Sequence, residues 1–279
     1  MANLTVLIPT YNEEENIKDC LESVKWADNI LVVDSFSNDS TLDIVKHYDV
    51  KILQHEYINS ASQKNWALNQ ISTEWVLIVD SDERVTEELK GEIQSIINNK
   101  GEHTGYYIPR KNYFLSKWMK YSDWYPDYNM RLFKLREGRY EERAVHAHVK
   151  LEGTVGYLQG HLVHYSINTI SQYIKKMDRY SSWEATERIK KKEGKVDFNW
   201  KQSSNRMRAK FLWHFLPLKP FLRFFWSYIL RKGFFDGYHG FILGVFNIFY
   251  EYLVAFKVKE MEKKLKHEIK PEFVKGSSF

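Results

Sequence analysis

The sequence predicts an α/β protein with a mixed, Rossmann-like sheet and a C-terminal helical extension. Three observations predict it. Short apolar runs alternate with helical segments at the start of the chain, the middle has strand signals without long helices, and no strand signal returns after Ser166. A length of 279 residues allows a large core, and an aromatic content of 16% needs one to cover it.

Four apolar, β-branched runs define the first part of the sheet. They span residues 4–9, 30–34, 51–53 and 75–80. A helical segment follows each of the first three, and strands joined in this way form a parallel sheet covered on both faces. In the first helical segment, residues 12–27, apolar residues recur at helical spacing, and Asn12 is the expected cap.

The middle of the chain extends this sheet. Strands are expected at residues 106–109, 130–134 and 155–164, and their close succession favours antiparallel pairing. From Ile170 the apolar positions keep a helical period. We therefore expect a first domain over residues 1–166, in two halves at 1–100 and 101–166, and a helical, basic and amphipathic extension over 167–279.

Two of the predicted strands end in an acidic residue, Asp34 and Asp80. Ligands of parallel sheets bind outside the carboxyl ends of the strands, so both are placed to meet one; the alternative is that each caps the next helix or turn. Asp80 opens the run Asp80–Ser81–Asp82–Glu83. Two carboxylates separated by one residue suit Mg²⁺ or Mn²⁺ shared with substrate phosphates.

Several classes of site are excluded by composition. No glycine precedes Gly91, so a glycine-rich phosphate loop is absent from the first 90 residues. The single cysteine, Cys20, excludes a disulfide framework and cysteine-based metal sites, and it fits a reducing compartment. The N-terminus lacks the basic start and apolar run of a signal peptide, so we expect the protein on the cytoplasmic side.

The C-terminal part of the chain is basic and rich in aromatic residues. Residues 187–232 contain 13 Lys and Arg against three acidic residues, whereas the whole chain has a net charge of +5, which argues against a uniformly basic nucleic-acid binder. The apolar tail that begins at Lys210 is expected to be divided into short helical pieces by Pro217, Pro220, Gly233, Gly237 and Gly240. Its longest piece, residues 240–256, is shorter than the about 20 apolar residues of a spanning helix and contains Asn247 and Glu251, so it is a weak candidate for a membrane span.

That longest piece has two different faces. One face of the helical wheel carries apolar residues: Phe241, Ile242, Val245, Phe246, Phe249, Tyr252, Leu253 and Phe256. Gly240, Gly244, Asn247 and Glu251 fall on the other. Beside the basic zone, this predicts a peripheral, monotopic helix on an anionic membrane surface. The alternative is that the apolar face packs against the catalytic body or a second subunit.

Four motifs in order carry a family resemblance: PTYNEEENI (residues 9–17), VVDSFSNDST (32–41), SASQKNWAL (60–68) and VDSDE (79–83). They resemble the family-2 glycosyltransferases of the GT-A fold. Later segments, among them WYPDYNMRLFK, LVHYSINTISQYIKKMDRYS and ILRKGFFDGYHGF, are similar to the bacterial branch that adds sugars to the lipopolysaccharide core, of the β-glucosyltransferase type, and to related envelope-glycan enzymes. The resemblance runs from about Leu4 to Lys259.

The resemblance implies a UDP-sugar donor and a Mn²⁺ or Mg²⁺ ion at a DXD motif. Residues 1–166 would be the catalytic domain, with the nucleotide-sugar half at 1–100 and the acceptor half at 101–166. Asp80 and Asp82 would bind ribose and metal, with Asp82 the direct ligand. Ser81 would contact the donor, and Lys64 would lie near it. Pro9, Tyr11, Glu13 and Asp34 would hold the uracil and ribose. The cation would neutralise the diphosphate in place of a glycine loop. The implied activity is transfer of a hexose, glucose first, to a saccharide or lipid-linked acceptor at the cytoplasmic face of a bacterial inner membrane.

Further site residues are expected from residue type. His164 could be a second metal ligand or a phosphate contact, or a satisfied core histidine. Lys176 and Arg179, on one helix face, could reach the diphosphate or an anionic acceptor. For the acceptor side we select residues that stack on sugars or hold anions, with packing as the alternative for each. They are Arg110, Trp124, Tyr125, Arg131 and His146.

The sequence departs from the family at one catalytic position. Relatives typically read VHE where this chain has Val145, His146 and Ala147. An inverting transfer needs a group that takes the proton from the acceptor hydroxyl, and alanine cannot take it. Our hypothesis is that Ala147 replaces the catalytic base and leaves the chain weakly active or inactive. Glu142 and Glu141 are the fallback bases, or else they form a solvated turn.

Two other classes of function compete with a transferase. A non-catalytic protein that binds glycans or nucleotide sugars, derived from such a transferase, is compatible with Ala147. A nucleotidyltransferase would carry a glycine-rich loop and a basic residue where this chain has PTYNEEEN.

Overall fold

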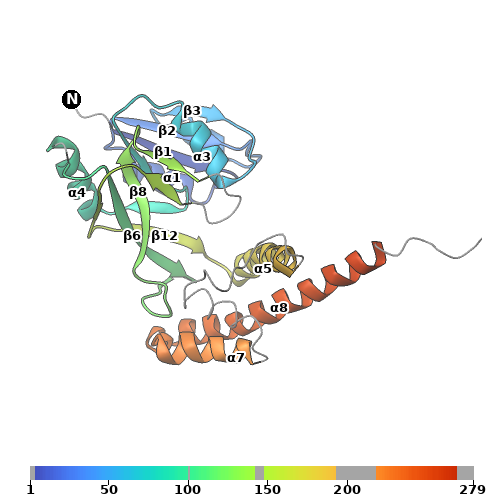
Figure 1. The fold of residues 1–279 in the computed structure, drawn as a ribbon. Helices are drawn as coiled ribbons and strands as arrows, with labels where there is room; N and C mark the ends of the chain where they lie inside the picture. Colours follow the sequence, from blue (N-terminus) through green and yellow to red (C-terminus); the bar gives the residue numbers. More distant parts are fainter. Residues whose placement is uncertain (1–3, 100, 142–147, 193–217, 269–279) are drawn as a thin grey trace, which may run out of the picture. The chain divides into compact units, whose positions relative to one another are not determined.

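The computed structural model describes residues 4–99, 101–141, 148–192 and 218–268. The chain forms two compact units, one of residues 1–120 and 124–166 and one of residues 121–123 and 167–279 (Figure 1). The first unit contains the sheet, and the second is helical.

The parallel part of the sheet is built from the four predicted runs. β1 (Leu4–Thr10), β2 (Asn29–Asp34), β3 (Lys51–Gln54) and β4 (Trp75–Ile78) are ordered β3-β2-β1-β4 and are all parallel. Between them lie α1 (Ile17–Val24), α2 (Thr41–Val45) and α3 (Ser60–Leu68). The predicted parallel arrangement is confirmed. It places the carboxyl ends of β1, β2 and β4 at the same edge of the sheet.

The remaining strands continue the sheet from β4 in the order β8-β6-β12-β5. β8 (Asp127–Lys134) is antiparallel to both β4 and β6 (Gly105–Phe114), and β12 (Leu162–Ile167) is antiparallel to β5 (Glu83–Val85). β7 (Lys117–Trp118) and β11 (Val155–Tyr157) pair with β6, and β9 (Gly138–Tyr140) pairs with β10 (Val149–Leu151) in a separate ladder. The predicted antiparallel extension is therefore confirmed, and the sheet is mixed.

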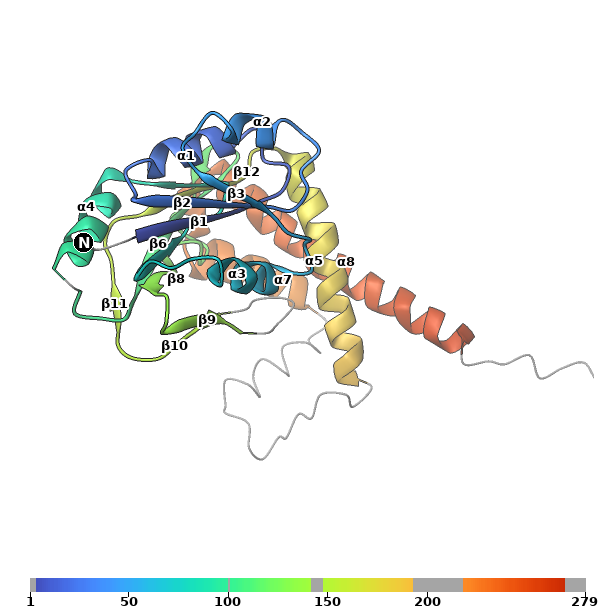
Figure 2. The same ribbon diagram turned by 90° about the horizontal axis from the view of Figure 1, so that it is seen from above.

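Each face of the sheet has its own core. On one face, Ile17, Leu21 and Val24 of α1 join Leu89 and Ile93 of α4 (Glu87–Asn98) against the strands. On the other face, Ala67 and Leu68 of α3 pack on Leu7, Leu31 and Phe133. Figure 2 shows α1 and α2 on one side of β1–β3 and α3 on the other. The two-sided cover matches the uninterrupted apolar character of β1, β2 and β4.

The predicted start of the first helix is wrong. α1 begins at Ile17, and Asn12 lies before it with a left-handed φ of 52°. Its side chain accepts from the backbone N–H of Asn38, at 2.9 Å, so Asn12 ties two loops together instead of capping a helix. The periodic residues Ile17, Cys20, Leu21 and Val24 are buried as predicted.

The predicted strand at residues 155–164 is two strands. The chain leaves the sheet after Tyr157 because the N–H groups of Gln159 and Gly160 donate to the carboxylate of Glu92 on α4. Gly160 lies so close to Leu89 that a Cβ atom there would stand 2.4 Å from its backbone. A glycine at this point lets the chain pass α4 and re-enter the sheet as β12.

The second unit contains α5 (Ile170–Lys192), α7 (Lys219–Phe224), a π-helical turn (Phe225–Leu230), a 3₁₀ turn (Gly233–Asp236) and α8 (Tyr238–Glu268). α8 packs against α5 and α7. The expectation that Gly240 ends a piece of the tail is wrong, since α8 continues through Gly240 and Gly244. A Cβ at Gly240 would meet the carbonyl of Gly233, and one at Gly244 would meet the ring of Phe224, so both glycines allow close packing.

The buried side of α8 carries Gly240, Gly244 and Glu251 together with the apolar residues Leu243, Val254 and Val258. Phe241, Phe249 and Phe256, on the predicted apolar face, are 46%, 49% and 62% exposed. Residues Tyr238–Lys264 are also long and apolar enough to cross a membrane, with a mean hydropathy of 1.6 over the best window, of which 28% is buried. Length and composition alone make this weak evidence for a span.

Candidate functional site

The candidate site lies at the carboxyl end of β4, where the run Asp80–Ser81–Asp82–Glu83 joins β4 to β5. The N–H of Glu83 donates to the carbonyl of Asp80 at 2.8 Å, which closes a tight turn. The neighbouring strand β1 is parallel to β4, so the loop after β1 meets this turn at the same edge of the sheet. The geometry is the one expected for ligand sites in open α/β sheets.

Two cations hold the carboxylate of Asp80. Lys64 Nζ lies 2.9 Å from Oδ1, and Arg131 Nη2 lies 2.7 Å from Oδ2. Burial alone would raise the pKa of Asp80, but Arg131 and Lys64 together hold it well below its usual value. Asp80 is therefore ionised, and both of its oxygens are engaged by protein cations.

Glu83 is the buried centre of the same network. Its side chain is fully buried and accepts from the backbone N–H of Asp80 at 3.0 Å, from Arg131 Nη2 at 2.7 Å and from Arg110 Nη1 at 3.3 Å. Arg110 also donates through Nε and Nη2 to Oδ2 of Asp127, at 2.9 and 2.6 Å. A buried carboxylate with these partners fixes the turn that carries Asp82.

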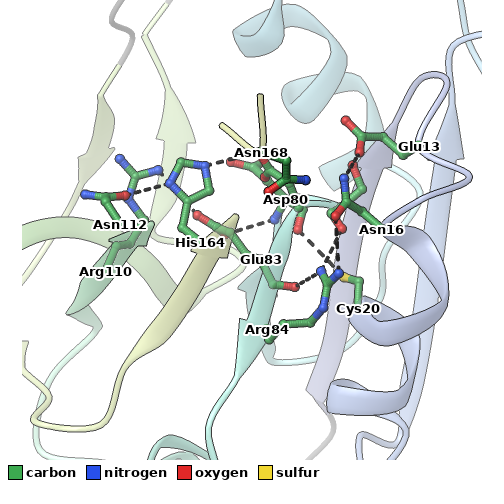
Figure 3. Close-up of polar contacts among 12 residues, drawn as sticks. Glu13, Asn16, Cys20, Asp80, Glu83, Arg84, Arg110, Asn112, His164 and Asn168 are labelled. Atoms are coloured by element: carbon green, nitrogen blue, oxygen red, sulfur yellow. Dashed lines mark hydrogen bonds and ion pairs between the residues drawn. The ribbon is translucent and has the colours of Figure 1, made fainter. Parts of the chain in front are cut away.

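Asp82 and His164 come together from distant parts of the sequence. β12 pairs with β5 so that His164 stands opposite Glu83, and the N–H of Tyr165 donates to the carbonyl of Asp82 at 3.0 Å. His164 Nε2 lies 3.2 Å from Oδ2 of Asp82, and both side chains are mostly buried. The other ring nitrogen, Nδ1, lies 2.6 Å from Oδ1 of Asn112, and Figure 3 shows the ring of His164 facing Asn112.

A carboxylate oxygen and an imidazole nitrogen at this separation could hold one divalent cation, with its remaining positions left for ligand oxygens or water. The described residues contain no group of three or more His, Cys, Asp and Glu side chains that could hold a metal by themselves. The residues present thus fit a cation that is shared with a bound phosphate group better than a closed structural metal site.

The loop after β1 and the loop after β2 are joined by several hydrogen bonds. The N–H of Glu13 donates to Thr41 Oγ1 at 2.7 Å, and the N–H of Glu14 donates to Asp39 at 3.1 Å. Burial raises the pKa of Glu13 to about 7, and the nearby carboxylate of Asp82 adds to the rise, while a hydrogen bond from Asn16 opposes it. Glu13 therefore lies within the electrostatic reach of Asp82.

The other residues expected around the nucleotide have varied surroundings. Asp34 is fully buried and accepts from Ser37 and from Gln54, so in this structure it orders its own loop. Tyr11 is 55% exposed, and Pro9 lies in β1 opposite Val33. Ser81 is buried, and its carbonyl accepts from Arg84. Their contacts with a donor stay predictions.

The residues expected on the acceptor side do not share one environment. Arg131 is buried in the network below Asp80, and Arg110 is bound to Glu83 and Asp127. The Trp124 carbonyl accepts from Asn112, and the Tyr125 hydroxyl lies 2.9 Å from His161 Nε2. Both arginines bind carboxylates of the protein, and their contact with an acceptor stays a prediction.

The remaining predicted residues lie elsewhere. Lys176 and Arg179 belong to α5 in the second unit, where Arg179 lies over the rings of Tyr180 and Trp183. Glu142, His146 and Ala147 lie outside the described residues. Glu141, beside them, has its N–H bonded to the carbonyl of His148.

Sequence reasoning missed two residues of the site. Glu83 directly follows the two aspartates, so its position next to the motif was an available signal. Asn112 lies near the end of the long strand β6, where an asparagine among apolar and basic residues gives no signal of its own.

Comparison with known proteins agrees with the resemblance seen in the sequence. Residues 5–149 match the family model described as glycosyl transferase family 2. The lipopolysaccharide core biosynthesis glycosyltransferase LpsC of Rhizobium meliloti is 28% identical over 263 residues, which cover 91% of each chain. An uncharacterized glycosyltransferase of Rickettsia typhi is 27% identical over 96% of this chain and 91% of its own.

Among solved structures, S. aureus TarS 1–349 in complex with UDP aligns with 98% of this chain and 95% of its own, at 16% identity and a TM-score of 0.45. Glucosyl-3-phosphoglycerate synthase from Mycobacterium tuberculosis, in complex with Mn²⁺, UDP and glucosyl-3-phosphoglycerate, aligns with 40% of this chain at a TM-score of 0.31.

Proposed function

The chain belongs to glycosyl transferase family 2 and is a glycosyltransferase, and from this premise we propose that it transfers a hexose, glucose first, from a UDP-sugar with inversion at the anomeric carbon. The proposed acceptor is the lipopolysaccharide core or another envelope-glycan or lipid-linked saccharide. The relative named for lipopolysaccharide core biosynthesis, which aligns over nearly the full length of both chains, supports this acceptor class.

The approach of Asp82 to His164 at the carboxyl end of β4 carries the proposal that the reaction depends on a divalent cation. Asp82 and His164 would hold Mn²⁺ or Mg²⁺, and the cation would supply positive charge to the diphosphate that leaves. Lys64 and Arg131 keep Asp80 ionised and in place beside this site. The first 90 residues lack a glycine-rich phosphate loop, so another source of positive charge is required.

The proposed chemistry is a single displacement. A base takes the proton of the acceptor hydroxyl, the hydroxyl oxygen bonds to the anomeric carbon, and the bond from that carbon to the diphosphate oxygen breaks. The family resemblance implies a glutamate, which would be the natural base, at the position where this chain has Ala147. We therefore propose that this chain is weakly active or inactive as it stands, and that Glu142 is the fallback base.

The test is UDP release from a panel of UDP-sugars, with acceptor extracts and mass spectrometry of the products. We expect Ala147→Glu to raise the rate at least tenfold over the natural chain with one donor, and chelation of divalent cations to abolish it. Ala144→Glu is the matched control, because it adds the same carboxylate three positions away. No gain in Ala147→Glu contradicts the role assigned to position 147.

A non-catalytic protein that binds nucleotide sugars is the second candidate, and Ala147 is the observation that favours it. It predicts UDP-sugar binding without turnover in both the natural chain and Ala147→Glu. Calorimetric binding measured beside the turnover assay separates the two candidates.

The helical unit supports a peripheral position on a membrane. Large apolar side chains are exposed on α7, on the turns after it and on α8. They include Phe221, Phe225, Trp226, Phe234, Phe235, Phe241, Phe249 and Phe256. The basic zone at residues 187–232 is adjacent in sequence. Rings that enter the lipid interface beside Lys and Arg that meet anionic headgroups are typical of monotopic binding, and we place the protein on the cytoplasmic side.

Flotation with anionic liposomes tests this position. We expect the full chain to float, and expect little flotation for a chain ending at Lys210 or for Phe241→Ser/Phe249→Ser/Phe256→Ser. Phe36→Ser is the matched control, because Phe36 is exposed to a similar degree in the first unit. Equal flotation of the triple variant and the control contradicts a role for α8.

A further inference from the structure

Asn112 lies on β6 between the ring of His164 and the carboxylate of Asp127, and its side chain is buried. We propose that Asn112 is a positioning residue, which fixes His164 in the tautomer whose Nε2 lone pair faces the cation position beside Asp82. This inference rests on the proposed metal site and deepens it.

The orientation of the Asn112 amide follows from its partners. Its nitrogen lies 3.2 Å from the carbonyl oxygen of Trp124 and 3.0 Å from Oδ2 of Asp127, and both of these atoms can only accept. A rotated amide would place its oxygen against two other oxygens. Oδ1 of Asn112 therefore points to His164.

The amide orientation decides where the proton of His164 lies. Oδ1 of Asn112 is an acceptor, and it lies 2.6 Å from Nδ1 of His164. Two acceptors cannot lie this close, so Nδ1 carries a proton and donates it. In the neutral ring Nε2 is then unprotonated and faces Oδ2 of Asp82, 3.2 Å away. Both atoms are acceptors, so this contact needs either a second ring proton or a cation between them. A lone pair next to a carboxylate oxygen is the donor arrangement that a divalent cation satisfies.

Asn112 is itself held by charged groups. Oδ2 of Asp127 accepts from Asn112 and from Nε and Nη2 of Arg110. Arg110 also reaches Glu83, the buried carboxylate beneath the turn of Asp82. The ring of His164 and the carboxylate of Asp82 are thus oriented by one connected set of hydrogen bonds. Partners of metal-bound histidines act in this way in other proteins, and their loss costs about 10- to 100-fold in metal affinity.

The first experiment leaves Asn112 unchanged. Nitrogen-15 NMR of the histidine rings in the chain loaded with Mg²⁺ and UDP, at about pH 9 where histidine is neutral, reports the tautomer of each ring. The His164 signals are assigned as those lost in His164→Gln. We expect the Nδ1–H tautomer for His164, and an Nε2–H tautomer overturns the proposal.

The second experiment measures Mn²⁺ affinity by calorimetry in the presence of UDP. Asn112→Leu removes the acceptor, so we expect a mixture of tautomers and an affinity about 10- to 100-fold lower. Asn112→Gln keeps both an acceptor oxygen for His164 and a donor nitrogen for Asp127, so the Nδ1–H tautomer should persist even where Asn112→Leu folds poorly. Asn129→Leu is the matched control, since Asn129 also donates to Asp127 but has no bond to His164.

The outcomes separate the inference from the function on which it rests. A natural chain that binds no Mn²⁺ with UDP overturns the proposed metal dependence. If the natural chain binds Mn²⁺ and Asn112→Leu binds it with the same affinity, only the positioning role is overturned.

Discussion

Lys64 and Arg131 bind the two oxygens of one carboxylate, that of Asp80, at 2.9 and 2.7 Å. Lys64 belongs to α3 and Arg131 to β8, so the end of β4 is fixed from two separate elements. The second bond of Arg131, to Glu83, extends this arrangement to the turn that carries Asp82.

Substitution of Arg131 should destabilise the first unit strongly. Arg131→Met removes a buried cation and leaves the fully buried Glu83 with a weaker set of partners. Breaking a buried pair in this way costs about 3–5 kcal/mol. Urea unfolding followed by far-UV circular dichroism measures it. The control is Lys25→Met, because Lys25 has only an exposed ion pair with Glu22; an equal loss in both variants would contradict the role of the network.

Asp82→Asn should weaken the proposed metal site without unfolding the protein. The amide keeps the shape of the side chain but removes the charge that faces the cation position. We expect turnover to fall by about 100-fold, which corresponds to about 3 kcal/mol of transition-state stabilisation. The assay uses the Ala147→Glu background if the natural chain is silent. Asp19→Asn, at an exposed position on α1, is the control. A normal rate and normal Mn²⁺ dependence in Asp82→Asn would refute the assignment of Asp82 as a metal ligand.

Glu13 should make stability fall as the pH rises. Its pKa is about 7 in the folded chain against an ordinary value of 4.5, so between these values the folded state holds a proton that the unfolded chain has lost. Stability from this group is present below about pH 4.5 and is lost as the pH rises through 7. Glu13→Gln should remove this dependence.

Unfolding midpoints in urea at pH 5 and pH 8 measure the effect of Glu13. The difference in midpoint between Glu13→Gln and the natural chain should be more favourable to the variant at pH 8 than at pH 5. Glu15→Gln, at an exposed position nearby, should show the same pH dependence as the natural chain. If stability changes with pH in Glu13→Gln as it does in the natural chain, groups other than Glu13 control the pH dependence.

Glu251 should hold the helical unit together. It is 3% exposed and forms ion pairs with Lys219, Arg223 and Arg188, from three different positions on α7 and α5. Burial would raise its pKa, but its bonds with Lys219 and the charge of Arg223 lower it overall. Its contribution is present above the ordinary pKa of about 4.5 and is lost as the pH falls through the lower folded value.

Glu251→Gln leaves three cations without this carboxylate, at a cost of about 3–5 kcal/mol. Hydrogen exchange of the α8 amides measures the loss locally, which suits a chain with two units. Glu260→Gln, in an exposed ion pair with Lys264 on the same helix, should leave protection unchanged. Unchanged protection in Glu251→Gln as well would show that apolar contacts alone hold α8.

The sequence predicted the sheet and the position of the site well, because both depend on local patterns. Uninterrupted apolar runs specify buried parallel strands, and acidic residues directly after such a run lie at its carboxyl end. The position of β5 and the pairing of His164 with it could not be predicted, since β5 has three residues and its partner lies some 80 residues away. Long-range pairing is set by the whole sheet and leaves no local signal.

The tail shows a different limit. The predicted separation of α8 into an apolar and a polar face is incomplete, because Leu243 and Val254 are buried on the same side as Glu251. Glu251 can lie inside because Lys219, Arg223 and Arg188 supply partners for its carboxylate. The cations and the acid are far apart in the sequence, so their pairing could not be foreseen.

The ladder between β12 and β5 has a further consequence. Adjacent side chains of a strand point to opposite faces, so sliding β12 along β5 by a single position would turn His164 away from Asp82 and bring Val163 or Tyr165 in its place. The segment from Leu158 to His161 sets this alignment through Gly160 and Glu92. An insertion or deletion of one residue in this segment would therefore shift the ladder and separate His164 from Asp82, although neither residue had been substituted.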